Sequence, residues 1–468
     1  MATMIRDKIR VFLVQAGLDS SFYVFRSHPI GLMYLASMAE HAFENVECHI
    51  LDLKVSSYTA KDVGRLACEF GADVVGISSM SMYSGLMNEA AGSARAALPD
   101  ALIIAGGPHA SCFPEAVLEN KDFDAVIEGE GEHALVEILR EFMAGNKPGY
   151  IPSVVTREFG RPERGIIEDP DTLPFPAWHR IDIQDYSRRS SFSILGRRHY
   201  MSLFTSRACP YRCIYCHNIF GNRFRPRSAE NVISEIRTIN DRYGISDFDI
   251  LDDAFNLKKE RVKTICETLI NEGPKITFAF PNGLRSDLLD EETLVLMREA
   301  GTTYISFAIE TASPRLQKLI KKNLNLEKAR NAINIASGLG IFCNGFFMAG
   351  FPTETEPELK STLNFAVKSP LDTAHFLKVT PYEGTELFEM VDDSTKALLK
   401  SRPQIARYDD QSFNLSNIPN KIFFSMIKNA SRRFFLNPFR ILSMFRHHPQ
   451  PGNILHFIRF ALIRLFLR

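Results

Sequence analysis

The sequence predicts an α/β protein built from two units and a helical tail. Apolar strand-like runs alternate with amphipathic stretches over residues 9–145, the alternation stops over 146–198, and it resumes from 199 to 390. Strands that alternate with helices indicate βαβ units and therefore parallel sheets. The 468 residues, 45% apolar and 24% charged, have the composition of two or three globular domains.

The first half, residues 1–145, fits a doubly wound domain. Its predicted strands are Ile9–Val14, Val46–Leu53, Asp73–Met80, Leu102–Ala105 and Ala125–Ile127. Its predicted helices are Ile30–Phe43, Ala60–Phe70, Gly85–Ala97 and His133–Met143. Five strands suit a flavodoxin-like sheet, in which ligands lie beyond the carboxyl ends of the strands.

Glycine and serine gather where three of these strands end. The chain reads DVVGISS from Asp73, AGGPHA from Ala105 and EGEGE from Glu128. Glycine lets the backbone approach a ligand closely. Any α/β domain also needs tight turns, so ligand binding and simple turn formation both remain open on this pattern alone.

Residues 146–198 read as a linker that wraps against both neighbours. Pro170, Pro174 and Pro176 argue against a continuous helix. The single tryptophan, Trp178, is expected to pack here as an anchor between domains.

Residues 199–390 fit a second α/β unit. Its predicted strands are Tyr200–Thr205, Phe248–Asp252, Ile276–Phe280, Tyr304–Ile309, Phe342–Met348 and His375–Val379. Its predicted helices are Ala229–Tyr243, Lys259–Asn271, Glu291–Ala300, Leu326–Leu339 and Pro357–Ser369. Six βα units are too few for a closed eightfold barrel. We therefore predict a partial (β/α)6 barrel with its chemistry at the carboxyl ends of the strands.

The C-terminal region, residues 391–468, is predicted to be helical and basic. Residues 411–468 contain no Asp or Glu, and nine Lys or Arg follow from Lys421 onward. The last helix candidate, Ile454–Arg468, is apolar nearly all round. Two interpretations stay open: an interfacial segment on a membrane surface, and a helical cap packed on the barrel.

Composition narrows the location and the partners. No apolar run is long enough for a spanning helix, and no signal-peptide core follows the N-terminus. We expect a cytoplasmic protein, with membrane association through the tail as the alternative. The net formal charge of zero gives no indication of a nucleic-acid partner.

Three of the eight cysteines are closely spaced and follow the first predicted barrel strand: Cys209, Cys213 and Cys216. Three thiolates within eight residues can hold a [4Fe–4S] cluster and leave one iron without a protein ligand. A zinc site with His217 as fourth ligand, or a c-type haem attachment, would also use this spacing. The remaining cysteines are expected to be small core residues: Cys48, Cys68, Cys112, Cys266 and Cys343.

CxxxCxxC with an aromatic residue before the last cysteine, here Tyr215, resembles the signature of the radical S-adenosylmethionine superfamily. The resemblance continues through RFRPRSAENVISEI, YGISDFDILDDAF, LRSD, GTTYISFAIETASPRLQKLIKK, GFFMAGFPTET and TPYEGTEL, in the family's order. In the first half, HPIGLMYLASMAE, ADVVGISSM, IIAGGPHAS and DAVIEGEGEHAL are similar to the cobalamin-binding domain of one subgroup. That subgroup includes the anaerobic magnesium-protoporphyrin ester cyclase and hopanoid methylases.

The resemblance assigns roles at the cluster and around it. It implies that Cys209, Cys213 and Cys216 ligate the cluster and that the Tyr215 backbone contacts adenine. Asp252 and Asp253 would accept hydrogen bonds from the substrate or the methionyl ammonium, or else cap a helix.

Further roles fall at the ends of later barrel strands. Arg285 would pair with the methionyl carboxylate, unless it is an ordinary surface arginine. Glu310 would bind the ribose hydroxyls or the ammonium, with a structural ion pair as the alternative. The turn on the adenine side would be formed by Gly350, Phe351 and Pro352.

The resemblance also implies a corrin site in the first domain. The expected contacts are Ser78, Ser79, Gly106, Gly107, Gly129, Glu130 and Gly131. The Asp-x-His-x-x-Gly motif that supplies a lower histidine ligand is absent. His28 and His109 are therefore expected to be surface or hydrogen-bonding residues, and the cobalt to be bound without histidine from this domain.

Three functions follow from the resemblance. The first is a cobalamin-dependent methyltransferase: a 5′-deoxyadenosyl radical abstracts hydrogen from an unactivated carbon, and methylcobalamin delivers the methyl group. The second is cyclisation or rearrangement with the same cofactors but no net methyl transfer. The third is a radical enzyme, or a non-catalytic partner, whose first domain binds no cobalamin. The expected partners are a small-molecule substrate, with a lipid-like molecule as one candidate class, and an electron donor of the flavodoxin or ferredoxin type.

Overall fold

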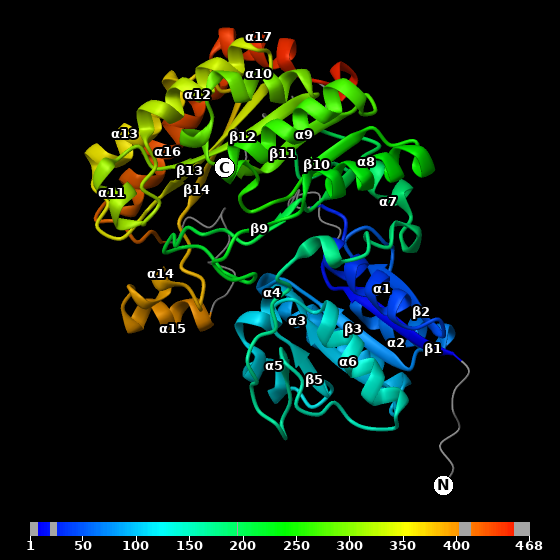
Figure 1. Cartoon of the computed structure of the whole chain (residues 1–468). Coiled ribbons are helices and arrows are strands. Elements are labelled where there is room, and N and C mark those ends of the chain that lie inside the picture. Colours follow the sequence, from blue (N-terminus) through cyan, green and yellow to red (C-terminus); the bar gives the residue numbers. More distant parts are fainter. Residues whose placement is uncertain (1–7, 19–25, 194, 402–412, 454–468) are drawn as a thin grey trace. The chain divides into compact units, whose positions relative to one another are not determined.

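The chain forms two compact α/β units (Figure 1). The structure is a computed structural model that describes residues 8–18, 26–193, 195–401 and 413–453. Unit 1 comprises Met1–Arg189 with Ile219–Gly221, and unit 2 comprises Ser190–Asn218 with Asn222–Arg468. The residues predicted as a linker are divided at this boundary, with 146–189 in unit 1 and 190–198 in unit 2.

The sheet of unit 1 contains the five strands predicted for a flavodoxin-like domain and a sixth, β6, which lies in the segment predicted as a linker. Its strands are β1 (Ile9–Gln15), β2 (Val46–Asp52), β3 (Val74–Ser78), β4 (Leu102–Gly106), β5 (Ala125–Ile127) and β6 (Val154–Val155). They lie in the order β2-β1-β3-β4-β5-β6. All pairs are parallel except β5 with β6. The switch in strand order falls between β1 and β3, where doubly wound sheets bind ligands.

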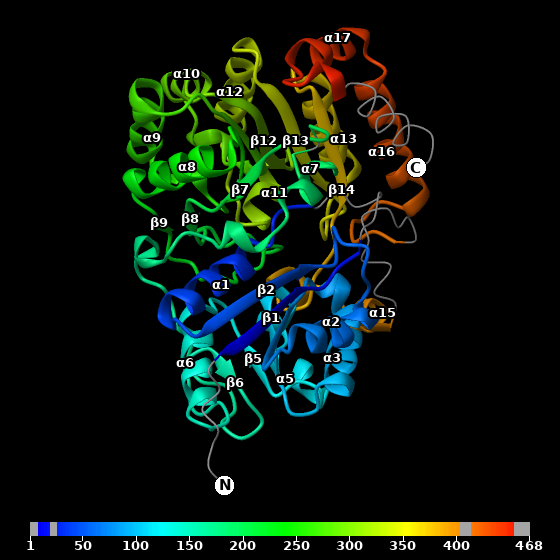
Figure 2. The same cartoon turned by 90° about the vertical axis from the view of Figure 1, so that its right-hand side faces the viewer.

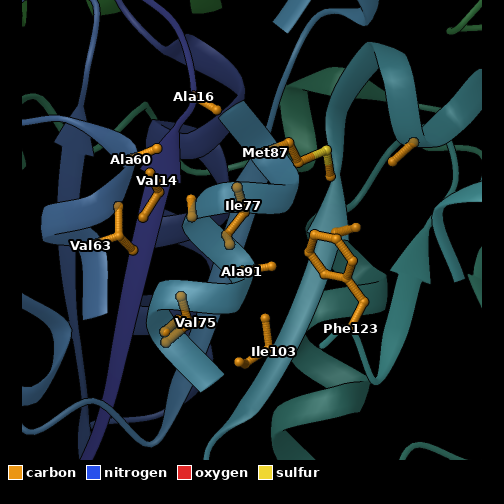
Figure 3. Packing of buried hydrophobic residues seen from close by; sticks show 14 of the residues in the cluster. Val14, Ala16, Ala60, Val63, Val75, Ile77, Met87, Ala91, Ile103 and Phe123 are labelled. Carbon is orange, nitrogen blue, oxygen red and sulfur yellow. The ribbon is translucent and has the colours of Figure 1, made fainter. Parts of the chain in front are cut away.

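Helices cover both faces of this sheet. The α-helices of unit 1 are α1 (Ile30–Ala42), α2 (Val63–Phe70), α3 (Ser84–Ala97), α4 (Gly107–Cys112), α5 (Pro114–Glu119), α6 (Glu132–Met143) and α7 (Ile183–Ser187), of which α7 lies in the segment after the sheet. Figure 2 shows α1 and α6 on one face and α2 and α3 on the other. Under α2 and α3, alternate residues of β1 and β3, such as Val14, Val75 and Ile77, pack against Met87 and Ala91 (Figure 3).

Two sequence predictions need correction: the start of one helix in unit 1 and the burial of two of the five isolated cysteines. The helix expected over 60–70 begins with a 3-10 turn, Ala60–Asp62, before α2. Cys48, Cys266 and Cys343 are buried as predicted, but Cys68 is exposed on α2 and Cys112 is half-buried at the end of α4. A cysteine's place in an apolar stretch does not fix which face of a helix carries it. Trp178 is buried within unit 1, with its ring centroid 5.7 Å from that of His28.

The sheet of unit 2 is the predicted partial (β/α)6 barrel. Its strands are β7 (Met201–Leu203), β10 (Asp247–Ile250), β11 (Thr277–Leu284), β12 (Thr302–Glu310), β13 (Phe342–Ala349) and β14 (Thr373–Lys378). They are parallel and neighbour one another in chain order. A separate pair, β8 (Ser206–Arg207) and β9 (Arg225–Pro226), is antiparallel. All six carboxyl ends therefore meet at one mouth.

Local capping explains where the barrel helices begin. The helices are α8 (Ala229–Tyr243), α9 (Lys259–Glu272), α10 (Glu291–Glu299), α11 (Pro314–Leu319), α12 (Leu326–Gly338), α13 (Glu356–Lys368), α14 (Glu386–Glu389) and α15 (Asp393–Ser401). The side chains of Ser228, Asp290 and Asn325 accept hydrogen bonds from backbone N–H groups in the first turns of α8, α10 and α12. Thr355 and Glu358 form a reciprocal capping box at α13.

The described part of the tail forms α16 (Asn420–Phe435) and α17 (Pro438–His447). α16 packs on α13 and β14, so this part of the tail does cover the barrel. The last predicted helix, 454–468, lies outside the described residues. Among the helices that the structure describes, none has the length and apolar character needed to span a bilayer.

Candidate functional site

The three clustered cysteines lie on a loop that leaves the barrel after β7 and returns through a short ladder. β8 pairs with β9 through Ser206 opposite Pro226 and Arg207 opposite Arg225. Ala208 has φ of +66°, a left-handed conformation that turns the chain just before Cys209. The loop is therefore closed at its base while the cysteines project from its middle.

Ile214, between Cys213 and Cys216, anchors the loop. Its N–H donates to the Ile320 carbonyl at 3.2 Å, and its carbonyl accepts from the Leu387 N–H at 2.8 Å. Its side chain is buried with Leu316 and Phe351. The Cys216 N–H also donates to the Cys213 carbonyl at 3.1 Å, which closes a tight turn between these two ligand candidates.

Cys209, Cys213 and Cys216 offer three thiols, and in an iron–sulfur cluster each thiolate binds a different iron. Among the described residues, no three His, Cys, Asp or Glu side chains are arranged to hold one metal ion. Burial raises the pKa of the Cys213 thiol, and the Lys322 ammonium partly offsets this by favouring the thiolate.

The Asp252 carboxylate is hydrogen-bonded to residues that follow the first barrel strand. This buried carboxylate accepts hydrogen bonds from the Thr205 N–H at 2.6 Å and from the Thr205 and Ser206 hydroxyls at 2.5 Å. These contacts fasten the start of the cysteine loop to the end of β10. They favour a positioning role for Asp252 over substrate binding. The next residue, Asp253, is exposed and remains the candidate carboxylate at this strand end.

Arg285 is also committed to neighbours. Its Nε donates to Asp287 Oδ1 at 2.9 Å, and its guanidinium lies 3.9 Å from the centroid of the Tyr211 ring. Tyr211 belongs to the cysteine loop. The arrangement favours a role in holding that loop over pairing with a methionyl carboxylate.

Glu310 is the last residue of β12, and a bulge at this strand end sets the direction of its side chain. Its register against β13 shifts between Ala308 and Glu310, and its φ is +63°. Bulges re-aim side chains and are frequent beside active sites. The buried Glu310 Oε1 accepts from the Lys322 Nζ at 2.9 Å. A carboxylate and an ammonium side by side can bind the opposite charges of an amino acid group.

Gln317 on α11 holds this strand end in place. Its Nε2 donates to the Ile309 carbonyl at 2.9 Å and to the Thr311 carbonyl at 2.6 Å, on either side of Glu310. Its Oε1 accepts from the Leu324 N–H at 3.1 Å. One buried amide thus fixes both the strand end and the segment that carries Lys322.

The turn after β13 contains Gly350, Phe351 and Pro352. Gly350 has φ of +94°, and its N–H donates to Glu354 Oε2 at 2.5 Å. Phe351 is buried, and its ring centroid lies 6.1 Å from that of Tyr215. The structure therefore brings the predicted adenine-side turn against the cysteine loop.

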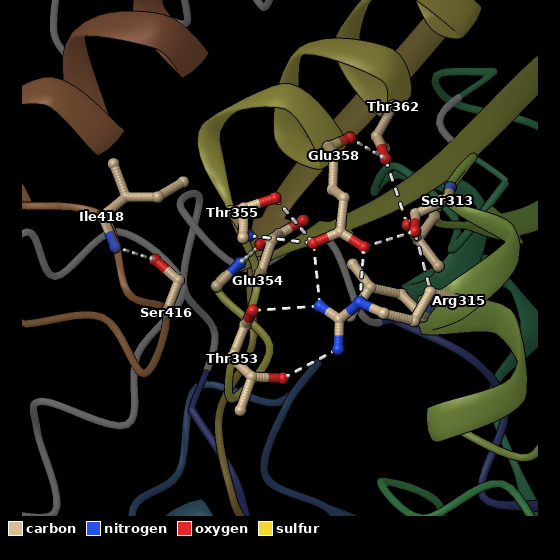
Figure 4. Close-up of polar contacts among 12 residues, drawn as sticks. Ser313, Arg315, Thr353, Glu354, Thr355, Glu358, Thr362, Ser416 and Ile418 are labelled. Carbon is tan, nitrogen blue, oxygen red and sulfur yellow. Dashed lines mark hydrogen bonds and ion pairs between the residues drawn. The ribbon is translucent and has the colours of Figure 1, made fainter.

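A polar network surrounds this turn (Figure 4). Arg315 donates two hydrogen bonds of 2.8 Å to Glu358 and two more to Thr353, to its hydroxyl at 3.0 Å and its carbonyl at 2.9 Å. Glu354 is fully buried, and its Oε1 has no hydrogen-bond partner among the described residues. Burial raises the pKa of Glu354 to about 7.

In unit 1, the predicted corrin contacts lie at the carboxyl ends of three adjacent strands. Gly107 has φ of +79°, and a Cβ there would lie 2.2 Å from the Ser78 Oγ. Only glycine permits this approach. The backbone N–H of His109 donates to the Ser79 carbonyl at 3.0 Å. This bond connects the turn after β4 to the end of β3.

Ser111 joins the turns after β4 and β5. Its hydroxyl donates to the Gly107 carbonyl and accepts from the Gly129 N–H, both at 2.9 Å. The structure thus brings together Ser78, Ser79, Gly106, Gly107 and Gly129–Gly131 as one cradle of backbone and small side chains. This cradle lies at the carboxyl ends of the strands, where doubly wound sheets bind ligands.

Two carboxylates, Glu128 beside this cradle and Glu130 within it, are hydrogen-bonded to the protein. Glu128 is buried and makes hydrogen bonds of 2.7 and 2.6 Å to Arg161 and a further short one to Arg164. Glu130 Oε2 accepts from the Ile167 N–H at 2.8 Å. The predicted ligand contact Glu130 therefore offers less of its carboxylate than the sequence suggests.

The two histidines near the family positions differ. His28 is buried and stacks on Tyr186 with 4.2 Å between ring centroids, so it is no surface residue. Burial, with the nearby Lys54, lowers the pKa of His28 to about 3. His109 is partly buried, and its Nδ1 lies 3.3 Å from the Ser81 Oγ.

Comparison with known proteins finds a matching family model for each of the two units. The B12 binding domain family model matches residues 23–139, and the radical S-adenosylmethionine superfamily model matches residues 203–366. An uncharacterized methyltransferase of Pyrococcus horikoshii is 30% identical over 90% of each chain. The chain belongs to the cobalamin-binding radical S-adenosylmethionine family.

Other family members carry named activities. The cytidylyl-2-hydroxyethylphosphonate methyltransferase of Streptomyces wedmorensis is 30% identical over 77% of each chain. The hopanoid C-3 methylase of Methylococcus capsulatus is 25% identical over 77% of this chain and 68% of its own. This chain is accordingly a radical enzyme of the methyltransferase type, and its cofactors are a [4Fe–4S] cluster, S-adenosylmethionine and cobalamin.

A solved structure shows the same fold. The radical methyltransferase TsrM of Kitasatospora setae, determined with cobalamin and a [4Fe–4S] cluster, matches with a TM-score of 0.67 and 18% identity. The match covers 81% of this chain and 74% of TsrM.

Sequence reasoning missed four residues of this enzyme's candidate site: Ile214, Gln317, Lys322 and Ser111. An apolar residue inside the cysteine motif was a visible signal for Ile214. The pair Lys321-Lys322, twelve residues after Glu310, gave no sign of which lysine is buried. The roles of Gln317 and Ser111 depend on distant backbone groups and had no local signal.

Proposed function

We propose that this enzyme transfers a methyl group to an unactivated carbon of a small molecule. The observation that carries the proposal is the pairing of a closed cysteine loop at the barrel mouth with a B12-binding domain in a chain similar to a methyltransferase over 90% of its length. Cyclisation or rearrangement without methyl transfer is the second candidate, because anaerobic magnesium-protoporphyrin IX monomethyl ester cyclases are also relatives.

Each part of the candidate site has a separate task in this proposal. When bound, the cluster supplies the electron that cleaves S-adenosylmethionine, and the cobalamin carries the methyl group. Cys209, Cys213 and Cys216 hold the cluster, and Ile214 keeps their loop against the barrel. Glu310 binds the methionyl ammonium or the ribose, and Lys322 binds the methionyl carboxylate.

The remaining residues position these groups. The Gly350–Phe351–Pro352 turn and the Tyr215 backbone bound the adenine side. Asp252 and Arg285 fix the cysteine loop through Thr205 and Tyr211. In unit 1, the cradle around Gly107 and Gly129 holds the corrin edge.

The products of S-adenosylmethionine distinguish the two candidates. With chemical reductant, we expect both 5′-deoxyadenosine and S-adenosylhomocysteine, because one S-adenosylmethionine supplies the radical and a second supplies the methyl group. Formation of 5′-deoxyadenosine alone under turnover would rule out methyl transfer. The Cys216→Ala variant serves as the control and should form neither radical product nor methylated substrate.

Reconstitution with hydroxocobalamin tests the corrin assignment independently. The full chain should retain a corrin absorption spectrum through gel filtration. A chain that elutes without it would reduce the proposal to a radical enzyme whose first domain has another task.

We also propose that the substrate is hydrophobic. The basic, aromatic tail supports this, as do two relatives whose names give a hopanoid and magnesium-protoporphyrin IX monomethyl ester as what they act on. The enzyme is incubated with cell extract, methyl-labelled S-adenosylmethionine and an electron donor of the flavodoxin or ferredoxin type. The label should then appear in the fraction extracted by organic solvent. Label confined to water-soluble products would contradict this.

A further inference from the structure

Helix α17 presents its polar face to the protein and its apolar face to solvent. Three polar side chains at helical spacing, Arg440, Ser443 and His447, point at the barrel. Arg440 is buried and donates to the Val367 and Ser369 carbonyls at 2.9 and 3.0 Å, at the C-terminal end of α13. A buried guanidinium there satisfies carbonyls that the helix leaves unpaired.

Asp372 completes the inward contacts of α17. Its Oδ1 accepts from the Ser443 hydroxyl at 2.7 Å and lies 3.1 Å from the His447 Nδ1. The Arg440 guanidinium also lies 3.6 Å from the centroid of the Phe434 ring of α16. These contacts fix the rotation of α17 about its axis, so its outer face is determined by the fold.

The outer face is strongly apolar. The exposed fractions are 81% for Phe439, 67% for Leu442 and 60% for Leu436, which lies between α16 and α17. Phe445 and Ile441 are exposed beside them. A surface helix normally turns its apolar side inward. We call this group, Leu436, Phe439, Ile441, Leu442 and Phe445, the α17 patch. Large apolar side chains left exposed together on one helix and the residue before it indicate an interaction site.

Five basic side chains are exposed on the same two helices as the α17 patch and its neighbours. Lys421, Lys428, Arg432, Arg433 and Arg446 are exposed on α16 and α17. None of the five makes an ion pair with another described residue, and residues 411–468 contain no Asp or Glu. Their positive charge is therefore available to a partner.

We propose that α16 and α17 dock this enzyme on an anionic lipid bilayer, with the α17 patch in the headgroup boundary. Apolar and aromatic side chains beside unneutralised Lys and Arg are the chemistry of interfacial helices. A second copy of the chain would bring the same positive charges together, which disfavours self-association. The fifteen residues after Asn453 repeat the composition, with three arginines and no acid.

Vesicle co-sedimentation of the full chain tests the proposal. Vesicles of phosphatidylcholine and phosphatidylglycerol in equal amounts should sediment the protein, and pure phosphatidylcholine should not. The double variant Phe439→Glu/Leu442→Glu should bind the anionic vesicles at least about tenfold more weakly, because two carboxylates replace the deepest apolar contacts. Arg432→Glu/Arg433→Glu should weaken binding in low salt.

Ile270→Glu is the matched control, since Ile270 is an exposed apolar residue on α9 of the same unit. It should bind like the wild type. Thermal unfolding of all variants should be unchanged, because each altered side chain is exposed.

Three results would overturn the proposal. The first is no binding of the wild type to anionic vesicles. The second is a pair of observations: the α17 double variant binds as well as the wild type, and Phe457→Glu/Leu462→Glu abolishes binding. That pair would place the contact in residues 454–468. The third is a wild-type dimer in gel filtration that the α17 double variant converts to a monomer, which would assign the patch to self-association. None of these results depends on methyl transfer, so the proposed function stands or falls separately.

Discussion

Lys322 and Glu310 form a buried ion pair of 2.9 Å at the end of β12, twelve residues apart in the sequence. The neighbouring Lys321 is exposed and pairs with the exposed Glu386 at 2.6 Å. Lys322 is buried and the adjacent Lys321 is exposed, so the same substitution at each position tests whether the buried lysine belongs to the site.

We expect Lys322→Met to destabilise the protein by about 3 kcal/mol, because it leaves the Glu310 carboxylate buried without its partner. S-adenosylmethionine binding should also fall at least about tenfold through the lost charge-assisted hydrogen bond. Lys321→Met should change stability by less than about 1 kcal/mol, as expected for an exposed pair. Denaturant unfolding and equilibrium dialysis measure both effects. Similar behaviour of the two variants would contradict the assignment.

Ile214→Ala should weaken retention of the iron–sulfur cluster. The side chain is buried, and its removal leaves a cavity that costs about 2–4 kcal/mol beneath the cysteine loop. We expect lower iron and sulfide content per chain after gel filtration, with all three cysteines intact. Ile270→Ala, at an exposed site, should keep full cluster content. Equal loss in both variants would show that Ile214 has no special role.

A comparison of Gly107→Ala with Gly129→Ala distinguishes the effect of a steric clash from the effect of backbone strain in the cradle. Both glycines have φ near +80°, so each alanine costs about 1–2 kcal/mol in conformational energy. Only Gly107→Ala also places a Cβ 2.2 Å from the Ser78 Oγ, whereas at Gly129 the nearest atom is 3.6 Å away. Cobalamin titration followed by absorption should show the larger loss of affinity for Gly107→Ala. The reverse order would refute the close approach as the reason for glycine.

Glu354 should make stability depend on pH. Its folded-state pKa is about 7, against an ordinary value of 4.5, so between these values the folded chain binds more protons than the unfolded chain. Stability therefore falls as pH rises through this window, by on the order of 3 kcal/mol. Glu354→Gln should remove this part of the decline. Urea unfolding at pH 5 and pH 8 compares the two proteins; identical pH dependence would show that Glu354 titrates normally.

The sequence alone was enough to predict the parallel strands of both sheets and the cysteine motif, but not the short antiparallel strand β6. Parallel strands buried on both faces leave nearly continuous apolar runs, and intervening helices leave a longer period, so the order of elements is written locally. The Cys209–Cys216 spacing is equally local. Family membership followed from motifs that remain in order along the chain.

Tertiary structure decided what the charged residues do. Asp252, Arg285 and Glu310 each follow a barrel strand in the sequence, and nothing local separates them. Asp252 is engaged by Thr205, 47 positions away, and Arg285 is held by Asp287 and Tyr211, while Glu310 is turned by a bulge beside Lys322. The outward apolar face of α17 was equally hidden, because its rotation depends on carbonyls at the end of α13. Burial of a charge or exposure of an apolar face depends on partners far along the chain, and only the folded packing brings those partners together.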